Sequence, residues 1–257
     1  MARLLALEGA ALLNLVVLAR LVGFCPSEAQ VSVLERALDY KRIGLNCCRQ
    51  WGKSTIVALM AVHKMLAYPG ATVLVVGPAE RQSGEFIEKV RVFLRRLGFP
   101  KLRGDGVNDV STRLANGSRI VGLPAREATT RGFSGVAMLI IDEAAWIPDE
   151  VILALTPSLA SSDGDLVLLS TPQGRRGYFY REMTAVENEG TWLRHTGPVT
   201  ECGFIKEKFL GEARRKGEAY FNQEFMCQFV ETGKYLFDEE RLKKAENLKE
   251  AGWRLIL

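Results

Sequence analysis

The sequence contains few of the residues that build metal sites and disulfide frameworks. Its 257 residues include five cysteines and only two histidines, and no two cysteines stand in a C-x-x-C spacing. The common zinc-binding patterns are therefore excluded, and an odd number of scattered cysteines is typical of thiols that stay reduced. We expect a reduced cytosolic chain without a structural zinc site.

Long apolar runs are also missing. Residues 1–24 are rich in leucine and alanine, but Glu8, Asn14 and Arg20 interrupt them. The longest charge-free run, 9–19, is about half of the roughly 20 apolar residues that a bilayer requires, and no small-residue cleavage site follows it. We expect a buried or partner-facing helix here and no membrane association.

Low-complexity tracts and internal repeats are absent, and neither sign of charge dominates. Lys and Arg total 34, Asp and Glu total 30, and 47% of the residues are hydrophobic. This composition is that of an ordinary globular protein, and the excess of +4 suits a polyanionic partner without indicating one. At this length we expect one main domain with a small appendage.

Apolar runs that alternate with amphipathic segments predict an α/β fold. Strands are expected at 42–48, 71–79, 137–145 and 165–174. Helices are expected at 27–40, 53–68, 80–98 and 149–162. Asn116-Gly117 lies between two alternating runs within 110–125, which predicts a β-hairpin. Strands alternating with helices imply a mostly parallel sheet covered on both faces.

The stretch NCCRQWGKST, residues 46–55, contains the second half of a phosphate-binding loop. Gly52, Lys53 and Ser54 follow a predicted strand and open a predicted helix, where backbone amides, a lysine and a hydroxyl could hold phosphates and Mg²⁺. Cys47 occupies the position of the motif's first glycine. The alternative interpretation is a chance Gly-Lys-Ser at a helix start. The loop residues expected to bind nucleotide are Arg49, Gln50, Trp51, Gly52, Lys53, Ser54 and Thr55.

Two adjacent acids follow the apolar run 138–141. Asp142 and Glu143 stand at the carboxyl end of a predicted strand, where open α/β sheets bind ligands. Asp142 is expected to hold Mg²⁺ through water, together with Ser54, and Glu143 to polarise the attacking water. The alternative is that the pair only caps the following helix.

Four motifs in this order carry a family resemblance. CCRQWGKST, TTRGFSG, MLIIDEAAW and LLSTPQG resemble the ATPase half of the large terminase subunit, the viral motor that drives DNA into an empty capsid. The resemblance runs from about Gln30 to about Phe237, and the family's usual loop, C-x-R-Q-x-G-K-[ST], also has a cysteine at the first glycine position. It implies a RecA-like P-loop NTPase of the additional-strand, catalytic-glutamate class.

The resemblance also implies roles for residues outside the loop. Gln30 would read the adenine edge, with an ordinary helix-surface glutamine as the alternative. Ser170 and Thr171 would form the coupling motif that senses the γ-phosphate, with a simple turn leaving a strand as the alternative. Arg131 would reach the ATP of a neighbouring subunit, and Arg49 inside the loop is the rival for that role. For Trp51, packing competes with stacking on a base.

From about residue 177 onward the pattern becomes mixed and more charged. We therefore expect a P-loop ATPase core with N-terminal helices at 1–177 and a smaller, mainly helical lid or linker at 178–257. In large terminases a nuclease domain follows the motor, and no acidic cluster for one is found in this chain, so we expect no DNA cleavage.

The expected activity is Mg-dependent ATP hydrolysis that powers the translocation of double-stranded DNA into a procapsid. By resemblance, the partners are DNA, the small terminase subunit and the portal, on which the chain would form a homo-oligomeric ring at the procapsid vertex in the host cytoplasm. In isolation a monomer is expected. Two alternatives remain open, namely a helicase-type DNA-dependent ATPase and a nucleotide-binding switch that hydrolyses nothing.

Overall fold

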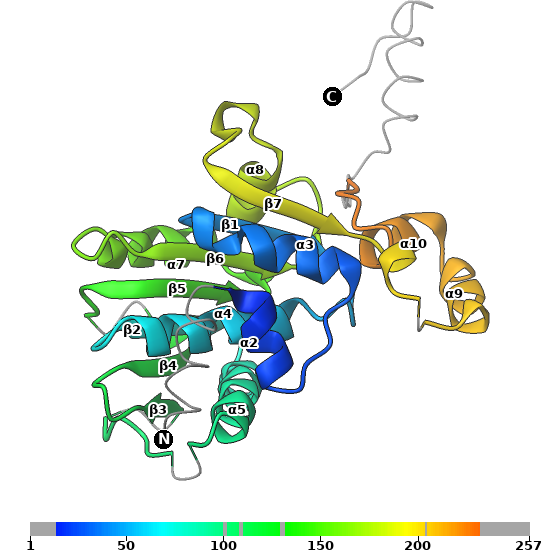
Figure 1. Cartoon of the computed structure of the whole chain (residues 1–257). Helices are drawn as coiled ribbons and strands as arrows, with labels where there is room; N and C mark the ends of the chain where they lie inside the picture. Colours follow the sequence, from blue (N-terminus) through cyan, green and yellow to red (C-terminus); the bar gives the residue numbers. More distant parts are fainter. Residues whose placement is uncertain (1–13, 100–101, 108–109, 129–131, 204, 232–257) are drawn as a thin grey trace, which may run out of the picture.

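The described part of the chain forms a seven-stranded sheet with helices on both faces (Figure 1). The computed structural model describes residues 14–99, 102–107, 110–128, 132–203 and 205–231. The strands are β1 (Arg42–Cys47), β2 (Thr72–Gly77), β3 (Ser111–Arg113), β4 (Arg119–Pro124), β5 (Val136–Asp142), β6 (Asp165–Ser170) and β7 (Trp192–Gly197). Their order is β3-β4-β2-β5-β6-β1-β7, and each neighbouring pair is parallel except the hairpin β3-β4.

Helices connect the strands and cover them. The α-helices are α2 (Leu15–Leu21), α3 (Glu28–Arg36), α4 (Lys53–Ala67), α5 (Glu80–Arg96), α6 (Ala125–Ala128), α7 (Asp149–Leu155), α8 (Gly177–Thr184), α9 (Glu207–Arg214) and α10 (Glu218–Glu224). The 3₁₀ turns are η1 (Ala37–Asp39), η2 (Ala144–Trp146), η3 (Thr156–Leu159), η4 (Val186–Asn188) and η5 (Val199–Glu201).

The core has two apolar layers because successive strand side chains point to opposite faces. In β2, Val73 and Val75 belong to the layer beneath α2, α3, α4 and α5, whereas Leu74 and Val76 belong to the layer beneath α7 and α8. β2, β5 and β6 are nearly continuous apolar runs since both of their faces are buried. The predicted strands and the hairpin are thereby confirmed.

Two departures from the sequence pattern have physical causes. The helix expected at 149–162 ends at Leu155 and continues as η3, because Pro157 has no N–H for an α-helical hydrogen bond. β7 was not expected. It adds to the free edge of β1, with Cys47 opposite Gly197, and therefore places sheet residues beyond the predicted boundary at 177. The division into core and lid stays a prediction.

Within the segment where an N-terminal helix is expected, the structure describes α2. Asn14 caps α2 by accepting from the N–H groups of Val16 and Val17, and the helix buries four residues against the core. The expected segment before residue 14 lies outside the described residues. Within the described part of the chain, no helix has the length and apolar character needed to cross a bilayer.

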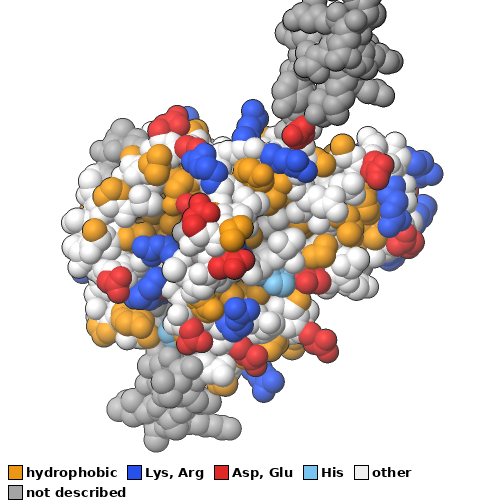
Figure 2. Space-filling view, turned by 90° about the horizontal axis from the view of Figure 1, so that it is seen from above, with side chains coloured by type: hydrophobic (Ala, Val, Ile, Leu, Met, Phe, Trp, Pro, Cys, Tyr) orange, Lys and Arg blue, Asp and Glu red, His pale blue; other side chains and the backbone are white. Residues whose placement is uncertain are grey.

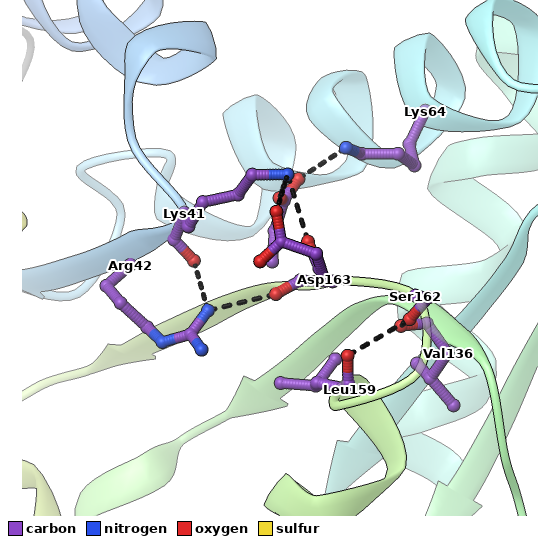
Figure 3. Close-up of polar contacts among 9 residues, drawn as sticks. Lys41, Arg42, Lys64, Val136, Leu159, Ser162 and Asp163 are labelled. Atoms are coloured by element: carbon purple, nitrogen blue, oxygen red, sulfur yellow. Dashed lines mark hydrogen bonds and ion pairs between the residues drawn. The ribbon is translucent and has the colours of Figure 1, made fainter.

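Charged residues fix the amino ends of β1 and β6 (Figure 3). Lys64 and Asp165 form an ion pair of 2.6 Å between largely buried side chains, and Nζ of Lys41 donates to the carbonyl of Asp163 at 2.9 Å. Arg42 donates to the carbonyl of Gly164, also at 2.9 Å. This network lies at the opposite end of the strands from the predicted phosphate loop, so its cations serve the fold.

Candidate functional site

The connection between β1 and α4 is a tight loop at the carboxyl end of the strands. Gly52 has a φ of 93° and caps α4, and Gln50 also has a positive φ, 67°. The positive φ favours glycine at position 52, and a Cβ added there would lie 2.6 Å from Nε2 of Gln30, so that this side chain would have to move. The loop therefore presents the amino end of a 15-residue helix at the edge where open α/β sheets bind ligands.

The first turn of α4 carries the lysine and the hydroxyls of the motif. Lys53, Ser54 and Thr55 follow Gly52 directly, and the N–H of Thr55 donates to the carbonyl of Gly52 at 2.9 Å. The Lys53 side chain is buried, with Nζ 3.5 Å from Oε1 of Glu143. The amine therefore lies against the acid that follows β5 and does not extend into solvent.

The acidic pair follows the strand as expected. Asp142 ends β5, and Glu143 comes next with a φ of 52°, a left-handed conformation that is costly for a non-glycine residue. Oδ1 of Asp142 accepts from the N–H of Glu143 at 3.1 Å. The Glu143 side chain makes no capping bond to η2. The helix-cap interpretation therefore has no contact to support it at Glu143, and the strained turn directs the carboxylate to Lys53.

Asp142 has an acidity set by its surroundings. Burial, assisted by the adjacent charge of Glu143, raises the pKa of Asp142 to about 6, while Lys53 acts in the opposite direction. Two acids share one lysine in this site, so an additional cation would stabilise their negative charge.

Ser170 joins this group from the neighbouring strand. Its Oγ donates to Oε2 of Glu143 at 3.3 Å and accepts from the N–H of Ala145 at 3.2 Å. Ser170 and Thr171 are both buried. Because β6 lies between β1 and β5, its end reaches both the phosphate loop and the acidic pair. The coupling role of Ser170 and Thr171 stays a prediction. A simple turn leaving the strand would not require the hydrogen bond between Ser170 and Glu143.

Gln30 lies beside the loop and is buried. Its Oε1 accepts from the N–H of Ser27 at 2.9 Å in a capping box, and its Nε2 donates to the carbonyl of Trp51 at 2.6 Å. It is therefore no helix-surface glutamine. Both ends of its amide are engaged within the protein, and its role toward adenine stays a prediction.

The indole of Trp51 is buried against β7. Its ring centroid lies 5.0 Å from that of His195, and its Nε1–H donates to Oε2 of Glu201 at 2.6 Å. The side chain thus packs inside the protein, as the packing alternative predicts, and only the main chain of Trp51 contributes to the loop surface.

Of the two candidate arginines, only Arg49 lies in the part of the chain that the structure describes. Arg131 lies outside the described residues. Arg49 has a largely exposed side chain whose Nε lies 3.0 Å from Oε2 of Glu224, a buried carboxylate on α10. The neighbouring Gln223 accepts from the N–H of Gly174, in the loop after β6, at 3.3 Å. The last two residues of α10 therefore contact both loops of the site.

Sequence reasoning missed Glu201, Gln223 and Glu224. Each lies in the charged segment after residue 177, where no motif and no hydrophobic period marks a residue as part of a site. The addition of β7 to the edge of β1 brings this segment against the loop. No signal in the single sequence could have found them.

Four of the five thiols are buried near the loop, and Cys25 is exposed. Burial raises the pKa of Cys47, and Sγ of Cys48 lies 3.7 Å from Sγ of Cys202. We predict that a disulfide reagent at pH 8 titrates one thiol per native chain rapidly and all five after denaturation, since thiolates are the reactive species. Cys25→Ser should abolish the rapid phase, and a rapid phase of two or more thiols would contradict the burial.

Comparison with known proteins identifies the family of the chain. Residues 45–244 match the family model "Terminase large subunit, T4likevirus-type, N-terminal". The large terminase subunits of Thermus phage G20c and Thermus virus P23-45 are each 29% identical over 178 residues, 62% of this chain and 36% of each relative. The chain thus spans little more than a third of the length of these curated relatives.

Solved structures agree in fold. The large terminase ATPase domain of Thermus phage P74-26 superposes with a TM-score of 0.71 at 23% identity, over 82% of this chain and 97% of that one. A large terminase from a thermophilic bacteriophage, solved in complex with ADP, gives 0.68 at 13% identity, over 83% and 57%. These likenesses confirm the expected RecA-like P-loop fold. The matching family model covers most of the chain, which therefore belongs to the family of terminase large subunits and includes the N-terminal region that the model describes.

Proposed function

We propose that this chain is an ATPase motor domain whose hydrolysis cycle translocates double-stranded DNA into a viral procapsid. One observation carries the proposal. Glu143, after β5, contacts both Lys53 of the phosphate loop, at 3.5 Å, and Ser170 at the end of β6, at 3.3 Å, at one edge of the sheet. Because the chain belongs to the terminase family, we connect this ATPase chemistry with DNA packaging.

The residues present suit Mg-ATP. The amides of the loop and the Lys53 amine would hold the outer phosphates, and the hard oxygen ligands that Mg²⁺ prefers are offered by the Ser54 hydroxyl and the Asp142 carboxylate. When bound, the ion neutralises charge that develops on the phosphates. A triphosphate near Nζ of Lys53 competes for the lysine with Glu143, which leaves that carboxylate to orient and deprotonate water.

The remaining roles follow the family pattern. Gln30 would lie at the adenine side, and Ser170 and Thr171 would pass the loss of the γ-phosphate to the DNA grip. Arg131 would act on the ATP of the adjacent subunit. Arg49 is the less suited finger, because the loop ties it to its own subunit and Glu224 engages it.

The partners are proposed on the same basis. They are double-stranded DNA, the portal on which a homo-oligomeric ring assembles, and the small terminase subunit, at the procapsid vertex in the host cytoplasm. Basic and acidic side chains are interspersed over the face shown in Figure 2. The DNA contact is therefore not marked there by a patch of one sign, and a salt-sensitive contact with the phosphate backbone is expected.

Complementation between two inactive variants tests the proposed motor. Arg131→Ala and Glu143→Gln should each hydrolyse ATP slowly, and their mixture should regain DNA-stimulated activity, because the glutamine subunit supplies an intact arginine to a neighbour with an intact glutamate. The specific rate of the wild type should rise with protein concentration. Arg126→Ala, which changes an exposed arginine of α6, serves as the control.

The rival functions give different results. A nucleotide switch stays slow at every protein concentration, with or without DNA. A helicase-type ATPase whose arginine acts within one chain shows a constant specific rate and no recovery on mixing. Either outcome would contradict the ring motor.

A further inference from the structure

Trp51, the residue before Gly52, is held by hydrogen bonds at its main-chain carbonyl and at its indole. Its carbonyl accepts from Nε2 of Gln30, and its indole N–H donates to Oε2 of Glu201, each at 2.6 Å. Gln30 comes from α3 and Glu201 from η5, on either side of the loop in sequence. Two distant parts of the chain therefore fix one residue of the phosphate loop.

The first contact sets the direction of an amide. In a trans peptide the C=O of one residue and the N–H of the next point in opposite directions. The carbonyl of Trp51 points toward Gln30, so the N–H of Gly52 points away from Gln30. Tight anion binding by backbone N–H groups requires them to be aimed before the anion arrives. The orientation of the Trp51-Gly52 peptide is thus one determinant of phosphate affinity.

The second contact fixes the side chain on the same residue. The indole lies on Gly197 so closely that a Cβ there would be 2.5 Å from Nε1 of Trp51. Nε2 of His195 lies 3.1 Å from the Glu201 oxygen that accepts from the indole. The N–H of Cys48 donates to the carbonyl of Gly197 at 2.9 Å, which ties the start of the loop to the same strand. The indole therefore packs on β7, and its N–H is held by the carboxylate of Glu201.

We propose that Glu201 is a positioning residue of the nucleotide site, which it supports through the indole of Trp51. The inference rests on the proposed function, since the orientation of the loop amides matters only if the loop binds phosphate. Glu201 does not touch the nucleotide. It restricts rotation of the Trp51 side chain, while Gln30 restricts the carbonyl, so that the loop keeps its binding geometry when empty.

The proposal predicts a particular kinetic pattern. Loop amides hold the phosphates in the ground state and in the transition state alike, so a misaimed amide weakens binding more than it slows the chemical step. Loss of one hydrogen bond to a charged group corresponds to roughly tenfold in affinity. Glu201→Ala should therefore raise the ADP and ATP dissociation constants about tenfold and change kcat by less than about threefold.

The test is a double-mutant cycle on the full chain, with ADP affinity by calorimetry and kcat as readouts. Trp51→Phe keeps a buried ring and removes the N–H donor. If the two residues act through their shared bond, the double variant binds ADP as weakly as the weaker single variant. Glu201→Gln retains an acceptor oxygen and should restore most of the affinity, while Glu212→Ala, at an exposed position of α9, should bind like the wild type.

A separate signal reports the contact itself. The indole N–H resonance of Trp51, assigned by its loss in Trp51→Phe, should move upfield and exchange faster with solvent in Glu201→Ala. In the variants that keep Trp51, this readout also shows that the chain is folded.

The outcomes separate the inference from the proposed function. Equal ADP affinity of the wild type and Glu201→Ala, additive effects in the cycle, or a fall in kcat with unchanged affinity would each overturn the role of Glu201 and leave the ATPase intact. A folded wild type that binds neither ADP nor ATP would overturn the proposed function, and this inference with it.

Discussion

Replacing Glu143 by glutamine is expected to suppress ATP turnover by about 10²- to 10⁴-fold, the range over which a positioned acid or base contributes. Glutamine keeps the shape and can still accept from Ser170, but it cannot take a proton from water. The amide also no longer carries the charge that faces Nζ of Lys53 at 3.5 Å. ATP affinity should therefore be preserved or slightly improved.

The measurement is steady-state phosphate release beside calorimetric ATP affinity. Glu150→Gln is the matched control, because Glu150 lies on α7 nearby with an exposed side chain. Equal turnover by the wild type and Glu143→Gln would refute the role assigned to this carboxylate.

Replacing Lys53 by alanine is expected to act on binding itself. The amine is the buried cation closest to the place where the outer phosphates would lie, and hydrogen bonds between charged groups correspond to roughly 10- to 100-fold in affinity. Its removal also leaves Asp142 and Glu143 adjacent without the lysine that now opposes the rise in the pKa of Asp142. We expect an ATP dissociation constant raised at least about tenfold, together with lost turnover.

Lys208→Ala, at an exposed position of α9, controls for the loss of one positive charge. A thermal melt of both variants separates lost binding from lost folding. A folded Lys53→Ala chain with wild-type ATP affinity would show that the phosphates do not contact this lysine.

The parts of the fold that the sequence predicts are those whose signal is local. β2, β5 and β6 are buried on both faces, so each is a continuous apolar run that ends at a turn. The Gly-Lys-Ser motif between β1 and α4 needs only its neighbours to be recognised, since its chemistry depends on a strand, a tight turn and a helix start. For the same reason the acidic pair after β5 could be placed at the correct edge.

β7 carries no such local signal. Its sequence, WLRHTG, buries only two of its six residues, because one side of this edge strand is open to solvent. It becomes a strand by pairing with β1 along its whole length. Periodicity cannot reveal a strand that tertiary pairing stabilises.

Contacts across long sequence separations could not be predicted either. Glu201 meets Trp51 across 150 positions, and Glu224 meets Arg49 across 175. A motif scan identifies the loop but not the residues that hold it. The same limit applies to Gln30, whose contact with the Trp51 carbonyl depends on how α3 packs beside the loop.

The most direct measurement is a calorimetric titration of the folded wild-type chain with ATP in the presence of Mg²⁺. We predict a saturable heat with one nucleotide per chain, retained by Glu143→Gln and strongly weakened by Lys53→Ala. The absence of any heat of binding from well-folded wild type, with Mg²⁺ present, would contradict the assignment of residues 46–55 as a nucleotide-binding loop.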